Sequence, residues 1–416
     1  MFVVRTCGSR RSRRRHALRI ATVATGVAVL VAACTSPSEP ALRTIDPRAL
    51  QQVVQRLADE LTVPGAFVLV HTPQGRYDAA AGTTEVGTRT PPTAGTHFRI
   101  ASNTKTFTAA LIVLLAQDGR IRFTDPVTAY VPDVPNGENI TVADLLTMRS
   151  GLYGYTQDPS LAQVMDAEPA KSWTPAEVLA IAYRHPPQFP PDTAYEYSNT
   201  NYALLGLIAE KAGGRTLSEQ FRDRLFEPVG LTKTSLPAAD DTAMPAPYSH
   251  GYMYGGSFYA LADDPYPAEM QAAARAGTLK PVDYTNQNPS YATAAGGAIS
   301  TADDLSTWMK ALVTGEVFDD DHHRQWTRSL RPEDPDAPGG QQYGYGISYQ
   351  RFAPRAAMYY HGGELPGFNS FMGYDPDNEV SLVIWTNLTL SPDGRTTAQA
   401  MLAPMLEQIY AGLSLG

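Results

Sequence analysis

The chain has 416 residues, of which 43% are hydrophobic and 18% charged, a composition that excludes a disordered or fibrous protein. Seven basic residues and no acidic residue precede Cys34, so the rest of the chain has 26 basic against 42 acidic residues, a net charge of −16. This acidity argues against nucleic acid or anionic lipid bound through a broad basic face, and two cysteines exclude a disulfide framework.

The first 33 residues have the pattern of an export signal. A basic run, Arg10-Arg11-Ser12-Arg13-Arg14-Arg15, precedes an uncharged apolar segment over residues 20–33, which is too short to span a bilayer core of about 30 Å. The segment ends Val31-Ala32-Ala33-Cys34, which resembles the lipobox of bacterial lipoproteins, where the cysteine is lipidated. We therefore expect a signal peptide over residues 1–33, a tether over 34–41, and a membrane lipoprotein anchored through Cys34 on the extracytoplasmic side. Ordinary secretion is the alternative.

Hydrophobic periodicity predicts the elements of the remaining chain. Helices are predicted over residues 41–61, 107–116, 142–148, 175–184, 202–212, 301–313 and 396–410. Strands are predicted over residues 66–70, 76–82, 343–351, 356–360, 369–375 and 380–386, the first two as a hairpin. Residues 237–295 are rich in Pro, Gly, Tyr and Asp and are expected to form loops. Strands at both ends with helices between them predict one sheet built from distant parts of the chain, plus a helical insertion.

The lysine content indicates a first chemical site. The chain has 27 arginines but only 6 lysines, and Lys105 is the single lysine with a serine, Ser102, three residues before it. Residues three apart share one face of a helix, and serine needs a neighbouring base to act as a nucleophile. Lysine can lose its proton when buried, whereas arginine in practice cannot. A capping serine beside a solvated lysine is the alternative interpretation.

Two further motifs contain residue types that move protons or bind polar substrates. Tyr197-Ser198-Asn199 directly precedes a predicted helix. A tyrosine can relay a proton if nearby cations lower its pKa, and an asparagine can orient a lysine and a substrate amide. His361-Gly362-Gly363 follows the predicted strand 356–360. Its glycines would let another backbone, such as a substrate's, come close, and its histidine could supply a donor or a positive charge. A helix cap and a hairpin turn are the corresponding structural alternatives.

In this order, Ser-x-x-Lys, Tyr-Ser-Asn and His-Gly-Gly resemble the active-site motifs of the serine β-lactamase and penicillin-binding protein superfamily. The resemblance is closest to the branch of class C β-lactamases, Streptomyces-type D-alanyl-D-alanine carboxypeptidases, D-aminopeptidases and related esterases. It covers roughly residues 45–412. It implies an α+β fold, an α/β sandwich with an antiparallel sheet flanked by helices. It also implies a catalytic domain over residues 42–412, with an α/β part at about 42–130 and 296–412 and a helical insertion at about 131–295.

The resemblance also implies roles for the motif residues. Ser102 would be the nucleophile, Lys105 its proton acceptor, and Tyr197 the residue that passes the proton to the leaving group. The backbone N–H groups of Ser102 and Glu364 would form the oxyanion hole. The implied substrate-binding residues are Asn199, His361 and Gly363. The family reaction acylates the serine and then hydrolyses the acyl-enzyme, without a metal or cofactor.

The predicted function is an extracytoplasmic serine hydrolase acting on a small molecule or a peptidoglycan peptide, either a D-alanyl-D-alanine carboxypeptidase or a β-lactamase-like enzyme. An esterase or D-aminopeptidase on the same fold and a non-catalytic binding lipoprotein are the alternatives.

Departures from the family pattern bear on the substrate. Gly362 and Glu364 stand where carboxylate-recognising members usually offer hydroxyls, so we expect weak reaction with penicillins and better turnover of small uncharged esters or amides. Met148-Arg149 replaces the common His-Thr before Ser-Gly-Leu. Outside these motifs, the acidic run of residues 319–323, Asp-Asp-Asp-His-His, is expected to form a solvated loop rather than a cation site.

Overall fold

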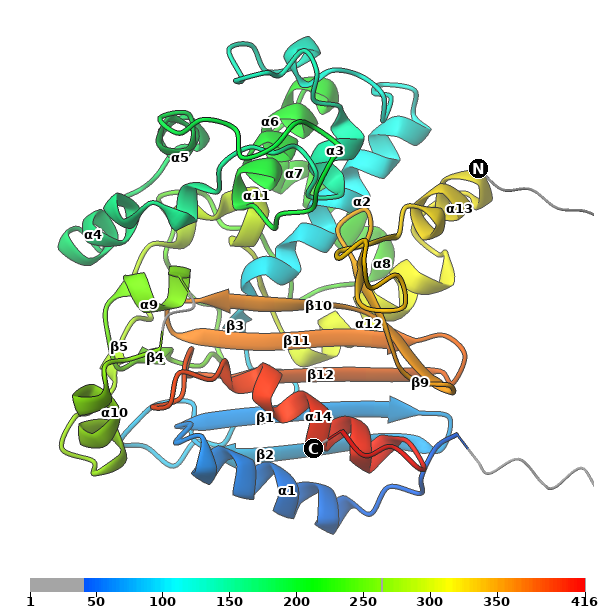
Figure 1. The fold of residues 1–416 in the computed structure, drawn as a ribbon. Helices are drawn as coiled ribbons and strands as arrows, with labels where there is room; N and C mark the ends of the chain where they lie inside the picture. The colour runs from blue at the N-terminus through cyan, green and yellow to red at the C-terminus, as the bar shows by residue number, and fades with distance from the viewer. Residues whose placement is uncertain (1–40, 263–264, 416) are drawn as a thin grey trace, which may run out of the picture. The chain divides into compact units, whose positions relative to one another are not determined.

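A computed structural model describes residues 41–262 and 265–415. Its centre is an antiparallel sheet with the strand order β2-β1-β12-β11-β10-β9-β8-β7 (Figure 1). Its strands are β1 (Gly65–Thr72), β2 (Gly75–Gly82), β7 (Arg331–Pro332), β8 (Gln342–Tyr343), β9 (Ser348–Ala353), β10 (Ala356–Leu365), β11 (Phe368–Asp375) and β12 (Val380–Thr386). The predicted α+β class, an antiparallel sheet flanked by helices, is confirmed.

Two strands far apart in the sequence, one early and one late in the described chain, are neighbours in this sheet. β1 pairs with β12 from Ala66–Thr386 to His71–Ser381, and β1 also forms the predicted hairpin with β2. Every residue of β11 and β12 is buried, which is typical of strands that helices cover on both faces.

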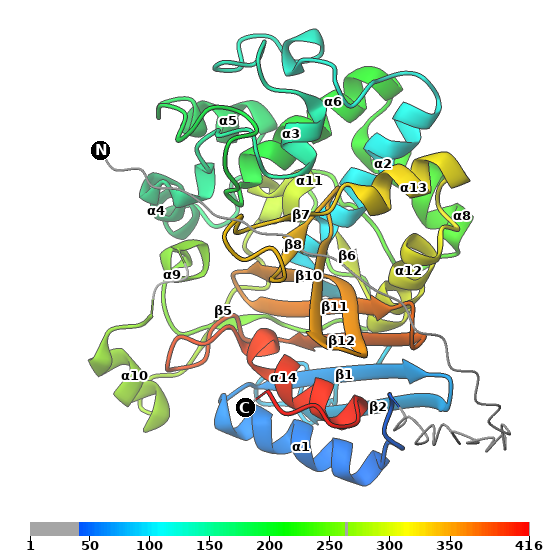
Figure 2. The same ribbon diagram turned by 45° about the vertical axis from the view of Figure 1, so that its right-hand side comes forward.

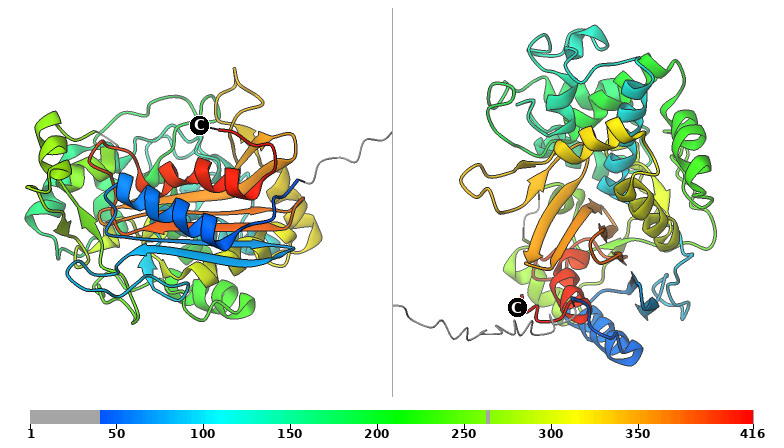
Figure 3. Two further views of the ribbon diagram at one scale, coloured as in Figure 1. Left: turned by 90° about the horizontal axis from the view of Figure 1, so that it is seen from below. Right: turned by 90° about the vertical axis from the view of Figure 1, so that its right-hand side faces the viewer.

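Helices lie on both faces of the sheet. α1 (Pro47–Glu60) and α14 (Thr397–Ile409) lie side by side on one face (Figure 3), while α12 (Ala302–Thr314) packs against β11 and β12 on the other. α1 begins six residues later than predicted, because Asp46 caps it by accepting a hydrogen bond from the Arg48 N–H and Pro47 opens its first turn.

The helical region is built around α2 (Thr104–Gln117), in which every residue from Thr104 to Leu115 is buried. An apolar helix of this kind is expected in a core. The other helices of this part are α3 (Val142–Leu146), α4 (Pro159–Ala167), α5 (Pro175–Ala182), α6 (Asn199–Gly213), α7 (Leu217–Phe221), α8 (Glu227–Val229) and α11 (Thr293–Gly296) (Figure 2). Over residues 41–262 and 265–415, no helix is long and apolar enough to cross a membrane.

Some predicted elements were wrong in extent or type. Residues 343–351 form two strands because Gly346, at φ +70°, turns the chain between them. β10 continues to Leu365, so His361-Gly362-Gly363 lie inside a strand and not after it. Residues 319–323 begin a helix, α13 (Asp320–Arg328), because Asp319 accepts a hydrogen bond from the His322 N–H.

The loop-rich segment 237–295 also contains regular elements that the sequence did not predict. They are β4 (Tyr252–Met253), α9 (Ser257–Ala262), α10 (Ala268–Arg275) and β5 (Val282–Asp283). The small two-stranded pair of β3 (Phe98–Arg99) and β6 (Ile299–Ser300) brings the start of α2 next to the chain that leaves this segment. This pair therefore fixes the position of Ser102, which follows β3 directly.

Candidate active site

Ser102 lies in a short 3-10 turn, Ala101–Asn103, that runs directly into α2. The turn is held from both sides. The Asn103 side-chain amide donates to Ser370 Oγ on β11 at 2.8 Å, and the Ile100 N–H donates to the Ala298 carbonyl at 3.1 Å. Ala101 has φ +50°, an unfavourable angle for a residue with a side chain, so the surrounding contacts impose the conformation of the turn. The hydroxyl is thus presented by a rigid segment.

Lys105 is one turn further along α2 and is fully buried. Its Nζ lies 2.9 Å from Ser102 Oγ, 2.6 Å from Asn199 Oδ1 and 2.8 Å from the carbonyl oxygen of Ala295. Burial lowers the pKa of this amine well below its ordinary range. A neutral amine has two N–H groups and one lone pair. In the deprotonated form, the two carbonyl oxygens, which can only accept, would take the two N–H groups and leave the lone pair facing the Ser102 hydroxyl.

Asn199 is the first residue of α6 and connects the lysine to the helical region. Its Oδ1 accepts from Lys105, and its Nδ2 donates to Thr156 Oγ1 at 3.2 Å, which fixes the orientation of the amide. The sequence analysis expected an asparagine that orients the lysine, and the structure brings the two side chains into contact.

Tyr197 completes the contacts of the nucleophile. Its hydroxyl is hydrogen-bonded to the Ser102 side chain, and its ring centroid lies 4.9 Å from Lys105 Nζ. Burial raises the pKa of Tyr197 above its ordinary value, so the condition considered for a proton relay, a pKa lowered by nearby cations, is not met here. Tyr197 is therefore a neutral phenol that donates a hydrogen bond to Ser102 Oγ, while the serine proton points to Lys105.

His361 lies inside β10 and is almost fully buried. Its Nδ1 is 2.6 Å from the carbonyl oxygen of Gly362, and its Nε2 is 3.2 Å from the hydroxyl of Tyr343. Since a carbonyl only accepts, Nδ1 carries the hydrogen and Nε2 accepts from Tyr343. Burial lowers the pKa of His361 to about 3, so the histidine is a neutral ring and not the positive charge that the sequence analysis considered.

Gly363 allows β10 to approach the serine turn. A Cβ at this position would lie 2.2 Å from the Ile100 carbonyl oxygen and 2.6 Å from Ser370 Oγ. The backbone that comes close is therefore the chain's own nucleophile turn, where the sequence analysis expected a substrate. The ladder between β9 and β10 ends at the Ser348–Tyr360 pair, whereas β10 continues for five more residues. This exposed edge, which contains the Glu364 backbone, borders the cleft in front of Ser102.

The cleft has a volume of about 460 Å³ and opens onto Ser102. Tyr195, Tyr197, Tyr343 and Tyr360 form much of its wall, and His361 to Glu364 form its edge along β10. Among the described residues that line it, none is a lysine or arginine, and Glu364 is the single carboxylate. Glu364 Oε2 accepts from Asn369 Nδ2 at 3.2 Å, and Asn369 also lines the cleft.

Met148 and Arg149 hold together segments around the cleft. The sequence analysis noted these two residues only as departures from the family pattern. Met148 Sδ accepts from the Ser198 N–H and from Asn201 Nδ2, each at 3.4 Å, at the start of α6. Arg149 Nη2 donates to the Pro332 carbonyl oxygen at 2.6 Å, which ties the end of β7 to the helical region. No motif pointed to these contacts, because each joins segments far apart in the sequence.

Glu333 lies in the loop between β7 and β8, and no motif in the sequence pointed to it. It accepts hydrogen bonds from Gln341 Nε2 at 2.8 Å and from the Tyr195 hydroxyl, and both partners line the cleft. Burial raises the pKa of this carboxyl. Glu333 thus fixes part of the cleft wall without lining the cleft.

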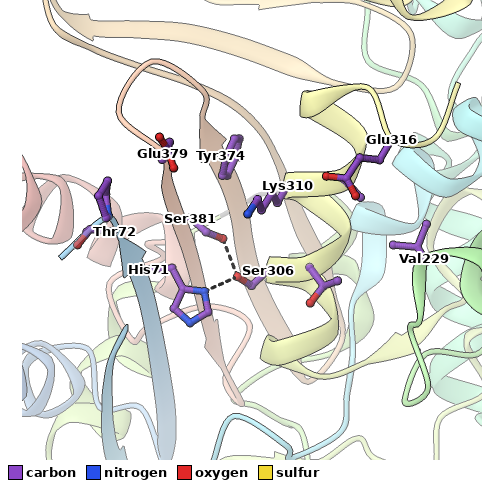
Figure 4. A pocket seen from close by; sticks show the side chains of 12 residues that line it. His71, Thr72, Val229, Ser306, Lys310, Glu316, Tyr374, Glu379 and Ser381 are labelled. Atoms are coloured by element: carbon purple, nitrogen blue, oxygen red, sulfur yellow. Dashed lines mark hydrogen bonds between the residues drawn. The ribbon is translucent and has the colours of Figure 1, made fainter. Parts of the chain in front are cut away.

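A second cavity of about 480 Å³ lies away from this site, between α12 and the ends of β1, β11 and β12 (Figure 4). In it, Ser306 Oγ lies 3.4 Å from His71 Nδ1 and 2.8 Å from Ser381 Oγ. None of the residues in contact with Ser102 lines this cavity. Ser102, the buried Lys105 amine and the open edge of β10 instead come together at the cleft described above.

Comparisons with known proteins identify the family of the chain. A model of the beta-lactamase family matches residues 50–404. The chain is similar to the structure of a D-stereospecific amidohydrolase from a Streptomyces species, with 29% identity and a TM-score of 0.72 over 85% of this chain and 98% of the other. It is also similar to the D-amino acid amidase of Ochrobactrum anthropi, with 26% identity and a TM-score of 0.73 over 87% and 98%.

Curated proteins show a weaker similarity. Unguisins hydrolase ungD′ of Aspergillus campestris is 24% identical over 367 residues, which cover 83% of this chain. The chain spans 62% of the length of that hydrolase, so the two proteins are not equivalent over their full lengths.

Proposed function

Because the chain belongs to the beta-lactamase family, whose members share a serine hydrolase fold, we propose that it hydrolyses amides or esters through an acyl-enzyme on Ser102. The observation that carries this proposal is the contact between Ser102 Oγ and a buried Lys105 amine whose two N–H groups are occupied by carbonyl oxygens. A serine beside a neutral amine has a base that can take its proton as it attacks.

The proposed reaction has two halves. In the first, Ser102 Oγ attacks the substrate carbonyl carbon while its proton moves to Lys105 Nζ, and the backbone N–H groups of Ser102 and Glu364 stabilise the oxyanion. The bond to the leaving group then breaks, and Tyr197 gives its hydroxyl proton to that group and takes the proton held by Lys105. In the second half, water attacks the ester carbonyl carbon and its proton passes to Lys105. Lys105 then gives that proton to Ser102 Oγ as the bond to the acyl group breaks and the acid leaves.

The chemistry of the cleft favours an amide or ester without a carboxylate near the scissile bond. Carboxypeptidase and β-lactam substrates both carry a carboxylate, and the described cleft lining offers it no cation, since His361 is neutral. Glu364 adds a negative charge to the same cleft. The two similar structures are a D-stereospecific amidohydrolase and a D-amino acid amidase, which supports amides of D-amino acids as the first substrates to test.

A direct test is the intact mass of the protein after separate exposure to a penicillin, a D-Ala-D-Ala peptide, D-phenylalanine amide and a neutral p-nitrophenyl ester. We expect a transient acyl adduct and product with the amide or the ester, slow or no adduct with the penicillin, and nothing with Ser102→Ala. Efficient acylation by the penicillin and the D-Ala-D-Ala peptide alone would favour the carboxypeptidase or β-lactamase prediction. No adduct with any compound would favour a non-catalytic binding protein.

We also propose that the protein is a lipoprotein outside the cytoplasm, anchored through Cys34. The support is the sequence pattern over residues 10–34, which lies outside the described residues. Labelling of growing cells with an alkynyl fatty acid should tag the wild type and leave Cys34→Ala untagged. Equal labelling of both proteins would contradict the anchor.

A further inference from the structure

We infer that the cleft selects substrates that carry a positive charge, an ammonium group, near the scissile bond, and that the carboxylate of Glu364 is its counter-charge. This inference rests on the proposed function and names the substrate class of the same site. It gives the Glu364 side chain a role separate from that of its backbone N–H in the oxyanion hole.

Strand alternation determines where the Glu364 side chain lies. Successive residues of a strand face opposite sides. Gly363 faces the serine turn, since its missing Cβ would meet the Ile100 carbonyl oxygen at 2.2 Å, whereas a Cβ on Gly362 would meet Gln399 Nε2 of α14 at 2.5 Å. The Glu364 side chain therefore lies on the same side as Gly362, towards α14, while its backbone belongs to the strand edge that borders Ser102.

The hydrogen bonds on that side hold the carboxylate in place. Asn369, directly opposite Glu364 in the β10–β11 ladder, donates from Nδ2 to Glu364 Oε2 at 3.2 Å. The orientation of Asn369 is itself fixed, because its Oδ1 accepts from the Ala398 and Gln399 N–H groups at the start of α14. The carboxylate is thus attached to the sheet and the helix, and it lines the same cleft as Ser102.

The charge balance of the cleft decides the sign of the ligand. In the described part of its lining, Glu364 is the single acid and no lysine or arginine is present. The amine of Lys105 is buried behind Ser102 and does not line the cleft. An anionic substrate would meet a like charge, whereas an ammonium would meet its counter-charge next to aromatic rings, whose faces also attract cations.

The test compares matched substrates that differ in charge. D-Phenylalanine amide and its deamino analogue 3-phenylpropanamide place the charge on the acyl side, and the N-(2-aminoethyl) amide of 3-phenylpropanoic acid places it on the leaving side. We expect the wild type to prefer at least one ammonium substrate by about 10- to 100-fold in kcat/KM. Glu364→Gln should remove most of that preference, measured within the variant as the ratio of kcat/KM for the ammonium substrate to kcat/KM for the neutral analogue. Glu379→Gln, which removes one acid from the second cavity, is the matched control and should keep the preference.

The pH dependence supplies a second readout. An α-amino group loses its proton near pH 7.7–8.0, so the preference of the wild type should fall as the pH rises through that range. A preference that persists in Glu364→Gln, or that does not change with substrate ionisation, would overturn the inference. Hydrolysis of neutral amides would then still support the proposed function. Absence of any Ser102-dependent turnover would instead remove the proposed function itself.

Discussion

At the scale of single residues, the spacing of Ser102 and Lys105 was enough to predict their contact, because three residues along a helix bring side chains to one face. The protonation states were beyond the sequence. Tyr197 and His361 are both neutral because of burial, and that burial comes from segments of the chain far from either residue. Local motifs identify the types of groups present, but only the packed structure determines their charge.

The lowered pKa of Lys105 leads to a prediction for arginine in its place. Lys105→Arg introduces a side chain that stays protonated and cannot take the serine proton, so kcat/KM for acylation should fall by about 10² to 10⁴-fold. In the wild type, activity should also fall towards low pH, because protonation of Lys105 removes the lone pair that faces Ser102. Lys310→Arg, a change at the second cavity, is the control and should retain activity. Substantial activity in Lys105→Arg would contradict the role of proton acceptor.

The neutral state of His361 can be observed directly. With a pKa of about 3, it should remain neutral with hydrogen on Nδ1 from pH 5 to 8, which ¹⁵N chemical shifts of labelled histidine report. In the unfolded chain a histidine takes a proton near pH 6.5. Acidification from 6.5 towards 3 therefore favours the unfolded state, and His361 contributes to a loss of stability over that interval. A titration midpoint near 6.5 in the folded protein would show that the ring is solvated.

At the scale of elements, most predicted helices and strands were found, with errors at their boundaries. His361-Gly362-Gly363 were expected to follow the strand 356–360, with a hairpin turn as the structural alternative, yet β10 passes through them. The reason is the neighbouring serine turn, which leaves no room for a side chain at position 363. A glycine needed for a tertiary contact and a glycine needed for a turn cannot be distinguished in a single sequence.

The different surroundings of Gly363 and Gly362 predict different losses of stability when each is replaced by alanine. Gly363→Ala should push β10 away from the serine turn, lower the free energy of unfolding by about 1–3 kcal/mol and reduce acylation of Ser102. Gly362→Ala should cost less stability, because the atom that its Cβ would meet is the end of the flexible Gln399 side chain. Thermal unfolding of the two variants makes the comparison. Equal losses would mean that the close contact with Ile100 does not constrain the strand.

At the scale of the whole molecule, the sequence predicted one sheet made from distant segments, but it did not predict the order of the strands in that sheet. The pairing of β1 with β12 brings the two ends of the domain together, and the Arg43 N–H donates to the Ile409 carbonyl oxygen at 2.8 Å. Which strands become neighbours depends on side-chain packing across the full sheet, and periodicity carries no information about partners.

The proximity of the ends predicts that a circular permutant will fold. Joining residue 413 to residue 42 through a short Gly-Ser linker, and opening the chain between the exposed residues Thr88 and Arg89, leaves every strand pair intact. We expect the permutant to unfold cooperatively within a few degrees of the wild type and to retain most of its turnover. A permutant that is soluble but cannot acylate Ser102 would show that the original connectivity is needed.

The position of β10 also determines when the candidate site is assembled. A ribosome completes Ser102 and Lys105 long before it makes the strand edge that faces them and the segments that bury the lysine. Until then the Lys105 amine lies in water, where burial does not lower its pKa, so Ser102 has no base beside it. Under the proposed function, hydrolysis can begin only when the last strands have joined the sheet, and a chain that ends before them would not hydrolyse substrate.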